Sequence, residues 1–219
     1  MPKVIVLVRH GETAWSLAGR HTGRTDLPLT ARGARRAGQL GAALAPCRPF
    51  RVFTSPLRRA QETCTLAGCV AAARTEPDLR EWDYGDYEGL TTPEIHQVHP
   101  GWNLFRDGCP AGESVADVAD RADRLLGRLR GLDGTLVLFS HGHFLRTLAA
   151  RWLGLPVPAG RQLTLSTGSV SLLGFEHPDG ETPAITLWNA GPDWLGRLPP
   201  GLDEGRRPDA SGTSGGTPH

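Results

Sequence analysis

Short apolar runs, each ending in a cluster of polar residues, recur along the chain. Val4–Val8 is a continuous run rich in β-branched residues, which is typical of a strand buried on both faces of a sheet. Arg51–Thr54 and Thr135–Phe139 repeat this pattern, and Ser169–Phe175 and Ala184–Trp188 also have the composition of strands. The pattern therefore predicts five strands.

Segments with helical spacing separate these runs. Thr30–Leu44 and Ser114–Leu132 each begin at a residue type that caps helices. Pro56 suits the first position of a helix that would extend to about Ala67. A fourth helix is predicted by apolar side chains at helical spacing after His141, namely Phe144, Leu145, Leu148, Ala149 and Trp152. Strands that alternate with helices predict an α/β domain with a mainly parallel sheet.

The length of 219 residues fits one generous domain, which we place at residues 1–198. From about Pro199 the chain is rich in Gly, Pro, Ser, Asp and Arg and has almost no apolar anchor, so residues 199–219 are expected to be a disordered tail. No apolar run approaches the roughly 20 residues of a spanning helix, and the start lacks the pattern of a secretory signal. We therefore expect no association with membranes.

Charge and cysteine content narrow the function classes. The formal net charge of +1 argues against a general nucleic-acid binder. Of the 24 basic residues only Lys3 is a lysine, which reflects either codon bias or a need for arginine's bidentate recognition of phosphate and carboxylate. None of the four cysteines forms a C-x-x-C pair, so they are expected to be reduced thiols of a cytoplasmic protein: Cys47, Cys64, Cys69 and Cys109.

Candidate chemistry collects where the three most strand-like runs end. Arg9 and His10 follow the first run, Ser55 and the Arg58–Arg59 pair follow the second, and His141 follows the third. If these strands are neighbours, the side chains converge on one crevice at the carboxyl edge of the sheet. Arginines that clamp oxygens beside a nucleophilic imidazole suit a phosphoryl group.

A further polar segment offers carboxyl groups beside aromatic rings, one of which could stay protonated and act as a general acid. It spans residues 79–89, and from the residues alone the choice among its acids stays open: Glu81, Asp83, Asp86 or Glu88. Glu113 and Ser114 fit a helix cap first and a pocket contact second.

Four segments resemble the histidine phosphatase superfamily, the phosphoglycerate mutase-like group, in order and spacing. They are Arg9–Thr13, Thr54–Ala60, Glu81–Gly89 and Ser140–Gly142, and the resemblance covers residues 3 to about 190. It implies a three-layer α/β/α sandwich. It further implies that His10 is the nucleophile that becomes phosphohistidine, and that Glu81 protonates the leaving oxygen. Arg9, Arg59 and His141 would form the phosphate pocket, with Arg59 chosen over Arg58 because it directly precedes Ala60.

Further motifs resemble the sedoheptulose-bisphosphatase-like branch, which removes phosphate from small sugar phosphates. The substrate contacts that this likeness implies, besides the pocket residues, are Ser16, Thr22, Gly23, Tyr84, Gly142 and Arg146. Many members carry Asn at the position of Ser16, and serine reaches less far toward a phosphate. The pair His141 and His143 has no third ligand at metal spacing, so we expect no metal and no cofactor.

The expected activity is therefore phosphomonoester hydrolysis, with a protonated His141 among the groups that hold the phosphoryl oxygens. Three rivals stay open: a phosphoglycerate-type phosphomutase, a phosphatase of a nucleoside or secondary-metabolite intermediate, and a non-catalytic domain that binds a phosphorylated ligand. A small phosphate ester is the expected partner, without nucleic acid, and a homodimer is left open.

Overall fold

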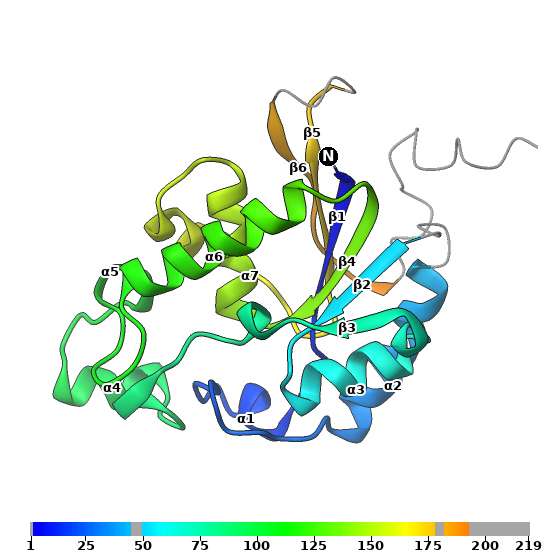
Figure 1. Ribbon diagram of the computed structural model, residues 1–219. Helices are drawn as coiled ribbons and strands as arrows, with labels where there is room; N and C mark the ends of the chain where they lie inside the picture. The colour runs from blue at the N-terminus through cyan, green and yellow to red at the C-terminus, as the bar shows by residue number, and fades with distance from the viewer. Residues whose placement is uncertain (1, 45–49, 178–181, 193–219) are drawn as a thin grey trace, which may run out of the picture.

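The computed structural model describes residues 2–44, 50–177 and 182–192. Six of its strands form one sheet in the order β3-β2-β4-β1-β5-β6 (Figure 1). The strands are β1 (Pro2–Arg9), β2 (Phe50–Thr54), β3 (Ala73–Thr75), β4 (Gly134–Ser140), β5 (Val170–Phe175) and β6 (Pro183–Ala190). The first four strands run parallel, whereas β5 is antiparallel to β1 and β6 is antiparallel to β5. The prediction of a mainly parallel sheet is confirmed.

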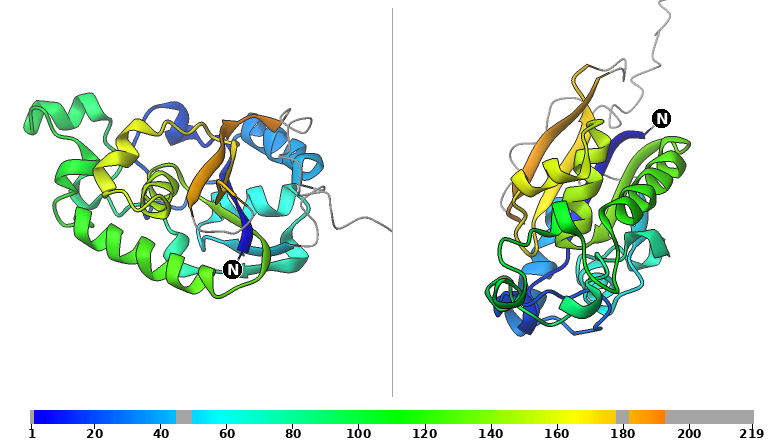
Figure 2. Two further views of the ribbon diagram at one scale, coloured as in Figure 1. Left: turned by 90° about the horizontal axis from the view of Figure 1, so that it is seen from above. Right: turned by 90° about the vertical axis from the view of Figure 1, so that its left-hand side faces the viewer.

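Helices lie on both faces of the sheet. They are α1 (Ala14–Leu17), α2 (Ala31–Leu44), α3 (Arg58–Leu66), α4 (Thr92–Val98), α5 (Leu104–Asp107), α6 (Val115–Arg130) and α7 (Gly142–Trp152). The 3₁₀ turns that lie wholly within the described residues are η2 (Val70–Ala72), η3 (Pro77–Leu79), η4 (Gly85–Tyr87) and η5 (Val157–Gln162). The view from above in Figure 2 shows α2 and α3 on one side of the sheet and α6 and α7 on the other.

Alternation along the central strands explains these three layers. In β1, Ile5 and Leu7 belong to the core cluster that includes the buried faces of α6 and α7. Val6 and Val8 belong to the second cluster, with Leu40 of α2 and Cys64 of α3. Because successive side chains of a strand point to opposite faces, a continuous apolar strand buries both sides and must be covered twice. The expected three-layer sandwich is confirmed.

Two predicted helix starts are confirmed and one is wrong. Ser114 accepts the Asp117 N–H and caps α6, and Thr30 accepts the Gly33 N–H at the start of α2. The helix predicted from Pro56 begins instead at Arg58. The proline therefore lies in the segment that leads into α3. At the start of the helix, the Arg58 N–H donates to Oδ1 of Asp26 at 2.7 Å.

The sequence pattern missed the short elements. β3 has only three residues, and α1, α4 and α5 have four, seven and four residues. Figure 1 shows α4 and α5 at the far end of α6 and α7, away from the sheet. α1 and α4 lie at the same lower end of the molecule as the carboxyl edge of the parallel strands, so they can contribute to a site there.

Several expectations fall partly or wholly outside the described residues. The predicted tail, 199–219, and Cys47 lie there. Cys64 and Cys109 are buried free thiols, and burial raises the pKa of each to about 12, so neither is a ready thiolate.

In the part of the chain that the structure describes, no helix combines the length and apolar character needed to cross a bilayer.

Candidate active site

The strand ends meet as the motif residues predicted. Arg9 is paired with Ser140 in the register of β1 and β4, and the His10 N–H donates to the Ser140 carbonyl at 2.9 Å. On the other side of β4, the Ser55 N–H donates to the Phe139 carbonyl at 2.9 Å. The register of three neighbouring strands therefore places Ser55, His141 and His10 side by side. The ring centroids of His10 and His141 are 5.2 Å apart.

The tautomer of His10 follows from its hydrogen bond to the backbone. Its Nδ1 lies 2.7 Å from the Gly11 carbonyl oxygen, and because that oxygen can only accept, Nδ1 carries the proton. The lone pair is consequently on Nε2. Burial, followed by the positive charges of Arg59 and Arg9, lowers the pKa of His10 well below its usual 6.5. At neutral pH the imidazole is thus uncharged, with Nε2 available to attack an electrophile.

His141 is held in the opposite tautomer. The Nε of Arg59 donates to its Nδ1 at 3.1 Å, and its Nε2 donates to the Ser55 hydroxyl at 2.8 Å. Burial and the nearby Arg59 charge also lower its pKa well below 6.5. The expectation of a protonated His141 is therefore wrong for this structure: an arginine N–H is always a donor, so it selects a neutral, accepting nitrogen. His141 is a neutral link between Arg59 and Ser55.

Arg59 is fully buried and fastens the loop of residues 22–25, which we call the 22–25 loop. Its Nη1 donates to the Thr25 carbonyl, and its Nη2 donates to the carbonyls of Thr22 and Gly23, all within 2.9–3.0 Å. The amides of the same loop are held from the other side, since the N–H groups of Gly23 and Thr25 donate to the Glu88 carboxylate. The loop is therefore clamped through its backbone.

Arg9 uses fewer of its N–H groups than Arg59 does. Its Nη1 donates to the Leu165 carbonyl, while its Nε is buried without a partner among the described residues. A side chain on Gly142 would lie 3.0 Å from the Arg9 guanidinium carbon, so the absence of one lets the guanidinium approach the start of α7. A buried, unpartnered cationic donor is costly unless an acceptor fills the site. Arg9 therefore marks a place for an anion.

The Glu81 carboxyl group lies at the N-terminus of α7. Its Oε1 accepts the N–H groups of Phe144, at 2.8 Å, and of Trp82, at 2.9 Å. Its Oε2 accepts the His143 N–H at 3.1 Å. Oriented amides at a helix start are a natural seat for a carboxyl group. Because α7 follows His141 directly, the same helix start carries a pocket histidine and orients Glu81.

The other acids of this segment are engaged elsewhere. Asp83 forms an ion pair with the exposed Arg24 at 2.5 Å, Glu88 clamps the 22–25 loop, and Asp86 is exposed. Of the four, Glu81, at 8% exposure, is the one that is both buried and attached to α7. The geometry thus separates four acids that the residues alone left equivalent.

Three predicted substrate contacts are committed to neighbours in this structure. The Ser16 hydroxyl accepts the Thr13 N–H and donates to the Thr13 carbonyl, which forms the cap of α1. The Thr22 hydroxyl donates to the Arg20 carbonyl, and the Gly23 N–H donates to Glu88. Serine's short reach leaves Ser16 in its own helix cap, as its departure from the family pattern suggests.

Tyr84 and Arg146 both lie close to Glu81 and Arg9. The Tyr84 hydroxyl is hydrogen-bonded at 2.6 Å to Nδ1 of His143, and burial lowers the pKa of His143 well below 6.5. Arg146 stacks over the Phe105 ring at 4.5 Å and donates to the carbonyls of Gly160 and Arg161. These residues form an aromatic wall beside Glu81, in which His21 also packs against Tyr84 with ring centroids 4.8 Å apart.

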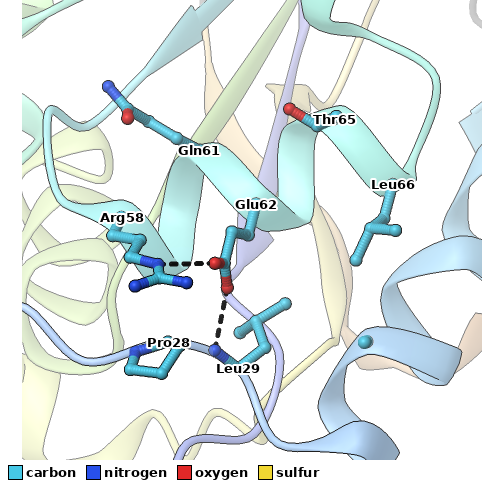
Figure 3. Close-up of a pocket in the computed structure, with 8 residues that line it drawn as sticks. Pro28, Leu29, Arg58, Gln61, Glu62, Thr65 and Leu66 are labelled. Atoms are coloured by element: carbon cyan, nitrogen blue, oxygen red, sulfur yellow. Dashed lines mark hydrogen bonds and ion pairs between the residues drawn. The ribbon is translucent and has the colours of Figure 1, made fainter.

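Arg58, the neighbour of Arg59, points away from the site. It lines a surface pocket of about 640 Å³ on the outer side of α3 (Figure 3). There its Nε donates to Glu62 at 2.6 Å, and Glu62 also accepts the Leu29 N–H at 2.9 Å. This pocket is thus separate from the crevice of His10.

Two residues that hold the site are not evident as such from the sequence. The sequence suggests Glu88 only as a possible proton donor and not as a residue that holds the 22–25 loop. Arg121 belongs to none of the motifs. A signal for Arg121 does exist, because it falls on the apolar face of α6 together with Val118, Ala122 and Leu125, where an unpaired charge would be costly. Within residues 2–44, 50–177 and 182–192, no group of three or more His, Cys, Asp and Glu side chains is placed to hold a metal ion.

The chain is similar to several known proteins. The family model described as "Histidine phosphatase superfamily (branch 1)" matches residues 5–191. An acid phosphatase of Mycobacterium tuberculosis is 48% identical over 178 residues, 79% of this chain and 87% of that protein. Sedoheptulose 1,7-bisphosphatase of Saccharomyces cerevisiae is 36% identical over 184 residues, 69% of this chain and 68% of that protein.

A solved structure of a Mycobacterium tuberculosis open reading frame superposes with a TM-score of 0.82 at 40% identity, covering 86% of this chain and 98% of that one. The fold and the named relatives together define a phosphatase. The chain belongs to the histidine phosphatase superfamily. The family and the enzyme class expected from the motifs are confirmed.

Proposed function

We propose that the chain is a phosphomonoesterase that acts on a small phosphorylated metabolite through a phosphohistidine at His10. The observation that carries this proposal is the free Nε2 of neutral, buried His10, whose Nδ1 is tied to the Gly11 carbonyl. The unpartnered Nε of Arg9 supports it, because a phosphoryl oxygen would supply the missing acceptor.

The reaction has two displacements at phosphorus. Nε2 of His10 attacks in line, the bond to the ester oxygen breaks, and Glu81 protonates the departing alkoxide. Glu81 then takes a proton from water, whose oxygen attacks phosphorus and breaks the P–N bond, which releases phosphate and restores His10. Arg9 and Arg59 stabilise the charge on the equatorial oxygens, and neutral His141 holds the Arg59 Nε.

A sugar phosphate or sugar bisphosphate is the favoured substrate. The 36% identical relative named for sedoheptulose 1,7-bisphosphate supports this class. The aromatic wall supports it as well, because its partly exposed member His143 offers a ring face and a neutral hydrogen-bonding group to a hydroxylated leaving group. We include Tyr84, Gly142 and Arg146 among the substrate-facing residues. Ser16, Thr22 and Gly23 would contact substrate only after leaving their present partners.

Phosphoenzyme trapping tests the mechanism. A phosphate ester labelled with ³²P, mixed with the protein and quenched in base, is expected to leave a base-stable, acid-labile label. His10→Ala should lose both the label and phosphate release, and His99→Ala, which changes an exposed histidine, should keep both. Label retained in His10→Ala would overturn the assignment.

The same assay separates the rival functions. Phosphate release that does not depend on a bisphosphate primer is expected for a phosphatase and excludes a phosphomutase. Failure to hydrolyse p-nitrophenyl phosphate at any pH would instead favour a non-catalytic binding domain. A screen of sugar phosphates against nucleotides and other phosphorylated metabolites distinguishes the sugar class from a nucleoside or secondary-metabolite intermediate.

The wider expectations belong to the same proposal. The reaction needs no metal and no cofactor, so a chelator should leave phosphate release unchanged. The protein is expected to be cytoplasmic, in keeping with its buried thiols, and to act without nucleic acid or membrane. A homodimer is an open alternative, and the molecular mass of the protein in solution tests it.

A further inference from the structure

Arg121 of α6 is a nearly buried arginine, 8% exposed, and three of its five hydrogen bonds go to carbonyls of the segment that carries Glu81. Its Nη1 donates to the carbonyls of Asp78 and Arg80, at 2.9 and 2.8 Å. Its Nη2 donates to the carbonyl of Glu81 itself at 3.3 Å. The guanidinium thus fixes the backbone that precedes Glu81 and also the carbonyl of Glu81.

Glu113 completes this arrangement. It binds Arg121 in a bidentate pair, Nε to Oε1 at 2.7 Å and Nη2 to Oε2 at 2.6 Å. Its Oε2 also accepts the Asp83 N–H at 3.0 Å, and its carbonyl accepts the indole N–H of Trp82 at 2.9 Å. Glu113 therefore fixes the segment on the C-terminal side of Glu81 and orients Arg121 at the same time.

The ring of Phe144 links this pair to the carboxyl group. The guanidinium carbon of Arg121 lies 4.2 Å from the Phe144 ring centroid, and the Phe144 N–H donates to Glu81 Oε1 at 2.8 Å. The backbone of Glu81 and one amide that orients its carboxyl group are thus both held through Arg121. A guanidinium has five N–H donors, and here all five hydrogens have acceptors.

We propose that Arg121, oriented by Glu113, is a positioning residue that places the Glu81 carboxyl group against the leaving oxygen. This inference rests on the proposed function, in which Glu81 is the proton donor. Proton transfer depends on position, and a displacement of about 1 Å in a catalytic group costs on the order of a hundredfold in rate. A lysine at position 121 would keep the charge but could not reach the same acceptors, because its three donors share one nitrogen.

The experiment compares two substrates that differ in their need for a proton donor. p-Nitrophenolate leaves readily without protonation, whereas the alkoxide of glycerol 2-phosphate needs a proton as it departs. For both esters kcat/KM reports the steps up to departure of the leaving group. Arg121→Lys is expected to lower kcat/KM by about 10- to 100-fold for glycerol 2-phosphate and by less than about threefold for p-nitrophenyl phosphate.

Arg124→Lys is the matched control. Arg124 lies on the same helix and also makes a bidentate pair, but the pair is exposed and its partner is the Asp78 side chain, at 3.0 and 2.8 Å, outside residues 80–83. It should leave kcat/KM for both substrates within about twofold. Glu113→Gln keeps the size of the side chain and should also lower kcat/KM selectively for glycerol 2-phosphate. It therefore tests the positioning role if Arg121→Lys does not fold.

The outcomes separate this inference from the function on which it rests. Equal losses for the two substrates, or no loss in both the Arg121 and Glu113 variants, would overturn the positioning role. Glu81→Gln is expected to show the largest selectivity, and if it shows none, Glu81 is not the donor and Arg121 has no donor to position. Absence of hydrolysis by the unmodified protein would instead overturn the proposed function.

Discussion

The two halves of the candidate active site are held by different means. His10, Ser55 and His141 follow strands directly, so the register of β1, β4 and β2 places them. Glu81 lies on an irregular segment between η3 and η4, and the side chains of Arg121 and Glu113 hold that segment. A hydrogen-bonded ladder spreads its support over many backbone groups, whereas the second arrangement depends on few side chains. Point mutations should therefore separate the two halves.

The largest effect is expected in the strand-end half. Arg9→Lys removes the buried Nε and the planar fork, so a phosphoryl group loses donors that act in the transition state. We expect kcat/KM to fall by about 10²- to 10³-fold, by the same factor for p-nitrophenyl phosphate and glycerol 2-phosphate. Arg58→Lys, a change in an exposed arginine, is the control and should have little effect.

Selectivity between the two substrates would contradict this comparison. If Arg9→Lys impaired glycerol 2-phosphate far more than p-nitrophenyl phosphate, the division into a phosphate half and a proton-donor half would be wrong.

The next largest effect concerns the backbone of the second half. Gly85 has a φ of +50°, and a side chain there would collide with the backbone of residues 110–112. Gly85→Ala should therefore lower the free energy of unfolding by about 3 kcal/mol, through strain and overpacking together. Gly101 has a φ of +77° with no atom within 4 Å of the place of a side chain, so Gly101→Ala should cost only about 1 kcal/mol.

Urea unfolding of the two glycine variants provides the measurement. Equal losses would mean that the segment carrying Glu81 can move away from residues 110–112 at little cost.

The pH dependence of stability should reveal buried neutral histidines at the strand ends and on the aromatic wall. Burial lowers the pKa of His10 and His141 well below 6.5, and it lowers that of His21, on the aromatic wall, to about 4. Between the two pKa values of each group, the unfolded chain binds a proton that the folded chain does not. The free energy of unfolding should therefore fall as pH falls below about 6.5, by up to about 1.4 kcal/mol per pH unit for each such group.

His21→Gln isolates one contribution. Its slope of unfolding free energy between about pH 6 and pH 4 should be smaller than that of the unmodified protein by roughly 1.4 kcal/mol per pH unit. Chemical denaturation at several pH values measures this slope. Identical slopes would show that His21 is protonated in the folded state over this range.

The smallest expected effect is a gain in stability. Ala111, in the segment against which Gly85 packs, has a φ of +54°, a conformation that disfavours a side chain. Ala111→Gly should raise the free energy of unfolding by about 1 kcal/mol without changing kcat/KM. A loss of stability would indicate that the greater freedom of glycine in the unfolded chain outweighs the relieved strain.

The contrast between the halves also explains what the sequence could predict. Val4–Val8 and Thr135–Phe139 are strong strand patterns, so the apolar pattern alone places the residues that follow them at one sheet edge. The acids of residues 81–88 have no such periodicity around them. Contacts with α7 and the 22–25 loop, which are distant in the sequence, distinguish Glu81 from Glu88.

Other failures have the same origin. β3 has three residues and exists because β2 offers it a partner, not because its own residues form an apolar run. The expected charge of His141 depended on which atom of Arg59 faces it, and spacing along a chain does not encode that contact. Long-range pairing and side-chain orientation are thus the parts that one sequence left undetermined.

The backbone clamping of the 22–25 loop has a consequence for how such an enzyme can diverge. Arg59 holds the loop by carbonyl oxygens and Glu88 holds it by amides, so neither contact depends on which side chains the loop carries. Substitutions at Thr22, Arg24 and Thr25 could therefore accumulate at the rim of the crevice while the main chain beneath them kept its shape. The loop can acquire preferences for new substrates while the arrangement of the reacting groups is inherited unchanged.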